Sequence, residues 1–157
     1  QDEPKGIADA LGMAEAFADE GPVCALLGDN IFEENDLSKH IHNFSERRGA
    51  HLFLKEVPDP QRFGVAEVKD GKVISLEEKP KNPKGNLAVT GCYLYDNRCF
   101  KRIKKLKPSA RGELEITDLS RHYLDGGELT ATILTGWWVD AGTPESLKRA
   151  EELVRIA

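Results

Sequence analysis

Residues 23–30 read Val-Cys-Ala-Leu-Leu-Gly-Asp-Asn, and this stretch decides the fold class. Its five leading apolar residues predict a strand buried on both faces, as in a parallel sheet, and Gly-Asp-Asn ends that strand in a turn. Before it, apolar residues recur at helical spacing from Ile7 to Phe17. A second helix, with Asp36 as its cap, and a second strand over residues 51–57 follow. This helix–strand–helix–strand order favours an α/β sheet with crossover helices.

The next part of the chain has a different character, because short alternating strands replace the helices. Two of them flank Asp70-Gly71, a dipeptide typical of a β-hairpin turn. At the carboxyl end, Thr143 can cap a terminal helix that begins at Pro144. We interpret residues 1–157 as a single domain. The remaining predicted elements are strands over 63–68, 73–78, 89–95 and 129–134, and helices over 100–106 and 116–124.

The composition is that of an ordinary globular chain, with 39% hydrophobic and 31% charged residues. The formal net charge of −5 argues against a nucleic-acid scaffold, which would show a basic face. No apolar run approaches the ~18 residues of a membrane span, so we predict a cytoplasmic protein without a membrane or nucleic-acid partner. Cys24, Cys92 and Cys99 lack CxxC spacing and are interpreted as buried structural thiols, without a disulfide framework or a zinc site.

Two acidic residues stand where a divalent cation is expected. Asp29 follows the first strand, and open α/β sheets bind ligands at the carboxyl ends of their strands. Asp140 lies in a glycine-containing turn before the last helix, where the backbone can approach a ligand closely. Two carboxylates from distant parts of the chain make a reasonable Mg²⁺ site, with waters and phosphate oxygens as the other ligands. Taken singly, each residue is better explained as part of a turn.

A carboxylate and two cations are candidate contacts to a sugar phosphate. Alternation along the strand places Glu78 on the face of Ile74 and Leu76, so it is expected to point into a cleft and to accept hydrogen bonds from sugar hydroxyls. Lys79 can meet a phosphate as a point charge, and Arg111, in a polar loop, can clamp one with its guanidinium fork. A solvated strand end and a charged surface loop explain the same residues equally simply.

Several stretches together resemble the sugar nucleotidyltransferase family, and most of all its glucose-1-phosphate thymidylyltransferase branch. They occur in the order and spacing of the family and cover essentially the whole chain. The most specific are LKPSARGELEITD at 106–118 and GDNIF at 28–32. The other matching stretches are residues 1–8, 59–65, 78–80, 88–96 and 138–143.

The resemblance implies a three-layer, Rossmann-like α/β fold. Its mixed, mostly parallel sheet would be flanked by helices and would carry an inserted β-hairpin region that binds the sugar. The implied contacts are Gln1 and Gly6 with the base; Gly64, Glu78, Val89 and Tyr93 with the sugar; Lys79 and Arg111 with the sugar phosphate; Trp138 as a wall of the sugar site; and Asp29 and Asp140 with Mg²⁺.

The resemblance also implies an activity, the Mg²⁺-dependent transfer of a nucleotidyl group from dTTP (or UTP) to glucose 1-phosphate. The products would be dTDP-glucose and pyrophosphate, with Asp29, Lys79, Arg111 and Asp140 as the catalytic residues. The family opens with a glycine-rich triphosphate loop of the form GxGTRLxPxTxxxxK, and no such stretch occurs in this sequence. We therefore expect a domain truncated at its N-terminus, without the first strand and helix of the family fold, and an isolated chain that is catalytically weak or inactive.

Two other interpretations compete with this one. A non-catalytic sugar-phosphate-binding or regulatory subunit of the same fold would also lack the triphosphate loop. Uridylyl transfer, or transfer to another sugar, would keep the enzyme class, because thymine and uracil differ by one methyl group, worth only ~1–3 kcal/mol of discrimination. Full-length relatives are commonly multimers, so a homo-oligomer is expected.

Overall fold

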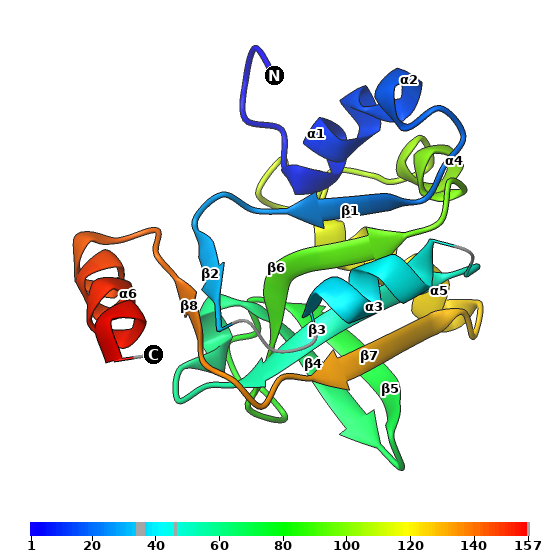
Figure 1. Cartoon of the computed structure of the whole chain (residues 1–157). Coiled ribbons are helices and arrows are strands. Elements are labelled where there is room, and N and C mark those ends of the chain that lie inside the picture. Colours follow the sequence, from blue (N-terminus) through cyan, green and yellow to red (C-terminus); the bar gives the residue numbers. More distant parts are fainter. Residues whose placement is uncertain (34–36, 46, 157) are drawn as a thin grey trace.

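The fold is built on a central sheet of six strands, seen in a computed structural model that describes residues 1–33, 37–45 and 47–156 (Figure 1). Two further strands, β2 (Asn30–Phe32) and β8 (Trp138–Asp140), form a separate small sheet beside it. The predicted α/β class is confirmed. The order across the central sheet is β5 (Lys72–Glu78), β4 (Gly64–Lys69), β6 (Leu87–Tyr95), β3 (Ala50–Glu56) and β7 (Leu129–Ile133), with β1 (Val23–Leu26) also paired to β6.

Helices cover both faces of this sheet, which gives three layers (Figure 1). Because successive side chains of a strand point to opposite faces, Leu52 and Leu54 join one core cluster and Phe53, between them, joins the other. Both clusters contain fully buried side chains. The first cluster packs against α1 (Ile7–Met13), α4 (Cys99–Ile103) and α5 (Ile116–Asp125), and the second against α3 (Leu37–Phe44).

The prediction of a mostly parallel sheet is wrong for the strands that the structure describes. Strand β6 lies between β1 and β3 and is antiparallel to both, so these two run in the same direction without pairing. The pairing of β3 with β7 is the parallel one among the described pairs. Strand β1 is also not buried on both faces, contrary to the prediction, because Cys24 and Leu26 are exposed. The three cysteines are free, and the Sγ atoms of Cys24 and Cys92 are 4.0 Å apart.

The predicted helix from Ile7 to Phe17 is interrupted. Helix α1 ends at Met13, and the N–H of the next residue, Ala14, donates to the Leu11 carbonyl in a tightened last turn; a short α2 (Glu15–Ala18) follows. Asp19 adopts a left-handed conformation that ends α2. Phe17 is consequently 92% exposed and does not belong to the core.

The last helix, α6 (Pro144–Ile156), begins as predicted. Thr143 accepts a hydrogen bond from the Ser146 N–H at 3.1 Å, and Pro144 occupies the first helical position. The predicted cap of α3, Asp36, lies outside the described residues. Among the residues that the structure describes, no helix is long and apolar enough to cross a membrane.

The β4–β5 hairpin contains a bulge that alters the predicted face of its side chains. The register shifts where Ser75 pairs with Glu67 and Val73 with Val68. Strand β5 therefore buries Val73 and Leu76, whereas Ile74 is 49% exposed. Glu78 shares a face with Leu76, as predicted. The prediction that Ile74 lies on the same face is wrong, because a bulge adds one residue and inverts the alternation beyond it.

Candidate functional site

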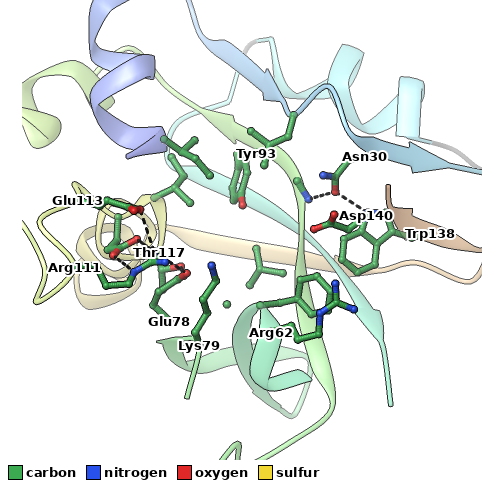
Figure 2. A pocket seen from close by; sticks show the side chains of 18 residues that line it. Asn30, Arg62, Glu78, Lys79, Tyr93, Arg111, Glu113, Thr117, Trp138 and Asp140 are labelled. Atoms are coloured by element: carbon green, nitrogen blue, oxygen red, sulfur yellow. Dashed lines mark hydrogen bonds and ion pairs between the residues drawn. The ribbon is translucent and has the colours of Figure 1, made fainter. Parts of the chain in front are cut away.

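A cavity of about 300 Å³ opens where the β4–β5 hairpin, β6, β8 and the start of α5 meet. Figure 2 shows side chains from these separate elements directed into one space. The structure thus brings most of the predicted site residues together. Those that line the cavity are Gly64, Glu78, Lys79, Val89, Tyr93, Arg111, Trp138 and Asp140.

The two candidate metal-binding carboxylates come close together beside this cavity. Strands β2 and β8 pair with Asn30 opposite Asp140, and the Ala141 N–H donates to the Asp29 carbonyl at 2.7 Å. An Oδ1 atom of Asp140 and an Oδ2 atom of Asp29 lie 3.0 and 3.4 Å from the point where a Cβ on Gly142 would stand. Asp140 lines the cavity, and Asp29 lies exposed beside it. Two carboxylates open to solvent on one side fit Mg²⁺, which keeps several waters and binds substrate phosphates.

Asn30 fixes the relative positions of the residues around these carboxylates. Its Oδ1 accepts hydrogen bonds from the Gly91 N–H at 2.8 Å and from the Trp138 indole N–H at 2.7 Å. Its Nδ2 donates to Asp29 Oδ1 at 2.8 Å. One amide therefore connects β6, β8 and the turn that carries Asp29, as the dashed lines to Asn30 in Figure 2 partly show.

Glu78 faces the cavity as predicted. It pairs across the hairpin with Gly64, where a Cβ would stand 3.0 Å from the Thr117 hydroxyl oxygen, so the glycine leaves room for the hydroxyl that binds Glu78. The Thr117 hydroxyl donates to the same Oε2 at 2.5 Å. Glu78 Oε1 lies 3.7 Å from Arg111 Nη2. A carboxylate that is half-buried and fixed in this way can accept hydrogen bonds from the hydroxyls of a sugar.

Lys79 places a positive charge next to Glu78. Its backbone has a left-handed φ of 42°, and its N–H donates to the Phe63 carbonyl at 3.0 Å, so the chain turns sharply after β5. Figure 2 shows the side chain reaching into the cavity. Within residues 1–33, 37–45 and 47–156, no hydrogen bond or ion pair holds its ammonium group. This cation is therefore available to an anionic ligand.

Arg111 is surrounded by three carboxylates rather than being free. Its Nε and Nη2 bind the two oxygens of Glu115 at 3.1 and 2.8 Å, and Nη2 also contacts Glu113 at 3.1 Å and Glu78 at 3.7 Å. Hydrogen bonding to Glu115 raises the pKa of Arg111. The predicted phosphate clamp thus lies at the cavity, with part of its fork already occupied.

Aromatic side chains form the walls of the cavity. Tyr93 is buried, and this burial is the main reason that the pKa of its phenol is raised. The negative charges of Glu78, Asp140 and Asp29 act in the same direction, so the phenol stays neutral. Trp138 packs edge to face on Phe63 with ring centroids 5.1 Å apart. Aromatic walls with a few fixed polar groups are typical of sites for small ligands.

Gln1 and Gly6 lie outside this cavity. Gln1 is exposed, and its Nε2 donates to the Gly6 carbonyl at 3.1 Å and to Asp9 at 2.7 Å. Gly6 has a φ of 99°, and a Cβ there would stand 2.4 Å from the Leu114 carbonyl oxygen. The close approach of two backbone segments therefore requires a glycine at position 6. The contact of Gln1 and Gly6 with a base stays a prediction.

Sequence reasoning did not single out several residues that line or shape the cavity. Arg62 and Phe63 lie in a stretch quoted for the family resemblance, and that was the available signal. Asn30 adjoins Asp29, but nothing local indicates its three hydrogen bonds. The same signal was available for five other side chains that were not predicted, because stretch 106–118 contains Glu113, Glu115, Ile116 and Thr117 and stretch 1–8 contains Ile7; Leu27 was not predicted either.

An α/β fold that gathers acidic, basic and aromatic side chains around one cavity has the features of a protein with a site for a small, polar ligand. The Nucleotidyl transferase family matches this chain over residues 1–155. The chain therefore belongs to that family.

Individual relatives agree with this assignment. Glucose-1-phosphate thymidylyltransferase of Neisseria gonorrhoeae is 46% identical over 159 residues, which cover 99% of this chain and 55% of that protein. The enzyme of that name from Xanthomonas campestris is 45% identical and covers 98% and 54%. The low-salt glycan biosynthesis nucleotidyltransferase of Haloferax volcanii is 42% identical and covers 98% and 44%. The chain thus spans about half the length of these curated relatives.

Solved structures show the same fold. A Bacillus anthracis crystal structure described as a glucose-1-phosphate thymidylyltransferase in complex with sucrose has a TM-score of 0.90 and 50% identity, and the match covers 100% of this chain and 64% of that one. A UDP-glucose pyrophosphorylase with bound UDP-glucose has a TM-score of 0.86, covering 98% and 64%. At 23% identity, the second likeness concerns the fold alone.

Proposed function

We propose that this chain supplies the sugar-phosphate side of a glucose-1-phosphate thymidylyltransferase. The reaction is the transfer of a nucleotidyl group from dTTP, or UTP, to glucose 1-phosphate, with release of pyrophosphate. The observation that supports it best is the meeting of the Asp29 and Asp140 carboxylates beside a cavity that also holds Glu78 and Lys79. These residues come from three distant parts of the sequence, and turn formation alone gives no reason for them to meet.

The residues of the cavity can perform complementary tasks in this reaction. Glu78 accepts hydrogen bonds from the sugar hydroxyls and so orients the ring. Lys79 and Arg111 neutralise the phosphate, which matters because two polyanions must approach each other before a phosphate oxygen of the sugar 1-phosphate attacks the α-phosphorus of the triphosphate. Positioning and charge neutralisation are the main contributions of a protein to phosphoryl transfer.

A magnesium ion held by Asp29 and Asp140 would supply further neutralisation of phosphate charge. The fit rests on the donor set: two carboxylates near one point, with Gly142 leaving the space between them open. Among the residues that the structure describes, no third His, Cys, Asp or Glu joins them. Such a sparse set suits an ion that retains waters and substrate oxygens as ligands.

The first test is calorimetric titration of the chain with glucose 1-phosphate in the presence of Mg²⁺. Glucose serves as the phosphate-free counterpart. We expect Lys79→Ala to weaken glucose 1-phosphate binding about tenfold or more, because a charge-assisted hydrogen bond contributes roughly 1.5–3 kcal/mol. Lys69→Ala, at the exposed end of β4, removes the same charge away from the cavity and should change nothing. Equal binding of glucose and glucose 1-phosphate would contradict the proposal.

The metal site has its own test. Mn²⁺ can replace Mg²⁺ as a paramagnetic probe, and electron paramagnetic resonance measures its free concentration. Asp140→Asn should abolish most of the Mn²⁺ binding, whereas Asp125→Asn, at the exposed end of α5, should not. Unchanged Mn²⁺ binding by Asp140→Asn would exclude this pair of carboxylates as the metal ligands.

The same titrations separate the competing interpretations. A binding module of unrelated purpose should respond neither to Mg²⁺ nor to glucose 1-phosphate. Comparing dTTP with UTP as ligands addresses the base, for which a single methyl group gives only a small preference. A cytoplasmic location and a homo-oligomeric assembly stay predictions.

A further inference from the structure

The loop before α5 holds Arg111 in a defined orientation through one particular carboxylate. Arg111 Nε donates to Glu115 Oε1 at 3.1 Å, and Nη2 donates to Oε2 at 2.8 Å. Two parallel N–H···O bonds between a guanidinium and a carboxylate fix both the position and the plane of the guanidinium. Figure 2 shows the guanidinium beside Glu78 and Thr117, at the edge of the cavity.

Glu115 is itself held firmly, so it can act as an anchor. Its side chain is only 8% exposed. The Ser109 hydroxyl donates to Oε1 at 2.6 Å, and the Ser109 Oγ also accepts the Arg111 N–H at 3.1 Å. Glu115 stands directly before α5, where its carbonyl accepts the Asp118 and Leu119 N–H groups. Serine, arginine and glutamate therefore form a closed ring of hydrogen bonds at the base of the helix.

The ionised state of Glu115 agrees with this role. Burial alone would raise the pKa of its carboxyl, but hydrogen bonds from Arg111 and Ser109 outweigh burial and lower it. Among the described residues, no partner is bonded to Arg111 Nη1. The guanidinium is thus held through Nε and Nη2, and donors on Nη1 remain for a phosphate.

Glu113 also contacts Arg111 Nη2, but it is not a buried, firmly held anchor. It reaches only Nη2, at 3.1 Å, and its side chain is 36% exposed. No second side chain in the described part of the molecule holds it. Because an exposed carboxylate bound by one contact is easily displaced, Glu113 does not fix the guanidinium.

We infer that Glu115 is a positioning residue that acts through Arg111, holding its guanidinium ready for the phosphate of the sugar 1-phosphate; this inference rests on the proposed function. A free arginine side chain has many rotamers, and it loses this freedom when it binds a ligand. Ordering it before the ligand arrives reduces the cost of binding.

The first arm of the test needs no ligand. The Nε–H resonance of Arg111, assigned by its loss in Arg111→Lys, reports whether the fork is formed. We expect a protected Nε–H signal in the wild type and in Glu113→Gln, and its loss to solvent exchange in Glu115→Gln, which has the same size but only one acceptor oxygen. A signal that persists in Glu115→Gln would overturn the inference.

The second arm measures glucose 1-phosphate binding in a double-mutant cycle. Glu115→Gln should weaken binding about threefold to tenfold, because a guanidinium that is not held beforehand must be immobilised when the ligand binds. Glu151→Gln, at an exposed position of α6 outside the cavity, should not weaken it. In an Arg111→Lys background, which keeps the charge but cannot form the fork, Glu115→Gln should have no further effect.

The outcomes distinguish the two proposals. If Glu115→Gln weakens binding equally in both backgrounds, Glu115 does not act through Arg111 and the inference fails. If Arg111→Lys leaves glucose 1-phosphate binding unchanged, the phosphate role of Arg111 in the proposed function fails, and with it the role assigned to Glu115. Loss of the Nε–H signal together with a non-additive cycle supports both.

Discussion

Asn30 is the residue at which three parts of the candidate site meet. Its amide accepts from Gly91 and Trp138 and donates to Asp29. An aspartate in its place would lose the donor and set a second negative charge against Asp29. An amide at this position is therefore needed to keep all three hydrogen bonds.

Gly91→Ala should disturb this arrangement. A Cβ on Gly91 would stand 2.4 Å from the Asn30 side chain, which must then move and lose its bond to Trp138. We expect a loss of about 1–3 kcal/mol in the free energy of unfolding, measured with urea, as for other overpacked positions. Gly28→Ala is the matched control, because its Cβ would meet nothing within 4 Å. Equal stability of the two variants would show that Asn30 is not fixed.

At the scale of single elements, the hairpin β4–β5 shows how a bulge overrides alternation. Counting by twos from Glu78 places Ile74 on the inner face, yet Val73 is the buried residue. Glu78 and Leu76 still share a face, because the bulge comes before both residues along β5. The predicted direction of the Glu78 side chain, into the cavity, is therefore found in the structure, although the alternation used to predict it fails at Ile74.

Two threonine substitutions in β5 test this correction. Val73→Thr buries an unpartnered hydroxyl in place of a methyl group and should cost about 1–3 kcal/mol of unfolding free energy. Ile74→Thr, at a site that is 49% exposed, should stay within about 0.5 kcal/mol. Thermal or urea unfolding of both variants gives the comparison, and the reverse order would mean that simple alternation holds.

Across the whole molecule, Asp96 joins elements that are far apart in sequence. It is buried and accepts hydrogen bonds from the Gly49 N–H at 2.7 Å, from the Tyr123 hydroxyl at 2.8 Å and from Arg98 Nε at 2.8 Å. Burial alone would raise the pKa of this carboxyl, but the hydrogen bonds from Arg98, Gly49 and Tyr123 outweigh burial and lower it. The start of β3, the end of β6 and helix α5 are thereby fixed to one another.

Asp96→Asn should consequently destabilise the fold more than a surface change. The amide presents one acceptor oxygen and a donor to groups that all donate, so we expect a loss of about 2–4 kcal/mol. Asp125→Asn, exposed on α5, serves as the control for urea unfolding. A loss below about 0.5 kcal/mol, the usual range of surface substitutions, would mean that the network contributes little.

The pH dependence of stability also belongs to the whole molecule. His51 is buried between Thr130 and Thr132; burial lowers the pKa of its imidazole to about 4, and the charges of His40 and Arg47 act in the same direction. The unfolded chain, with an ordinary pKa near 6.5, binds the proton first. Stability from this residue is therefore complete above pH 6.5 and declines as the pH falls towards 4.

Between pH 7.5 and pH 5, we expect His51 to account for about 1–2 kcal/mol of lost unfolding free energy. The measurement is urea unfolding at a series of pH values, in the wild type and in His51→Gln, which cannot take up the proton. The decline over this range should be shallower in the variant. Parallel curves would show that His51 titrates normally in the folded protein.

The sequence alone determined the class of fold, the hairpin, the last helix and its cap, and the family. These depend on local patterns: apolar spacing, turn dipeptides and motif order, which neighbouring residues specify by themselves. It also indicated candidate site residues, because carboxylates and cations at strand ends and in loops suit phosphate chemistry.

Only the tertiary structure decided the direction of the strands and the partners of the site residues. Strand β6 enters between β1 and β3 from a distant part of the chain, and no local pattern specifies that placement. Likewise, the approach of Asp29 to Asp140 depends on the pairing of β2 with β8. The anchoring of Arg111 by Glu115 depends on burial and on Ser109. Burial and long-range pairing are properties of the packed chain, so residue spacing could not predict them.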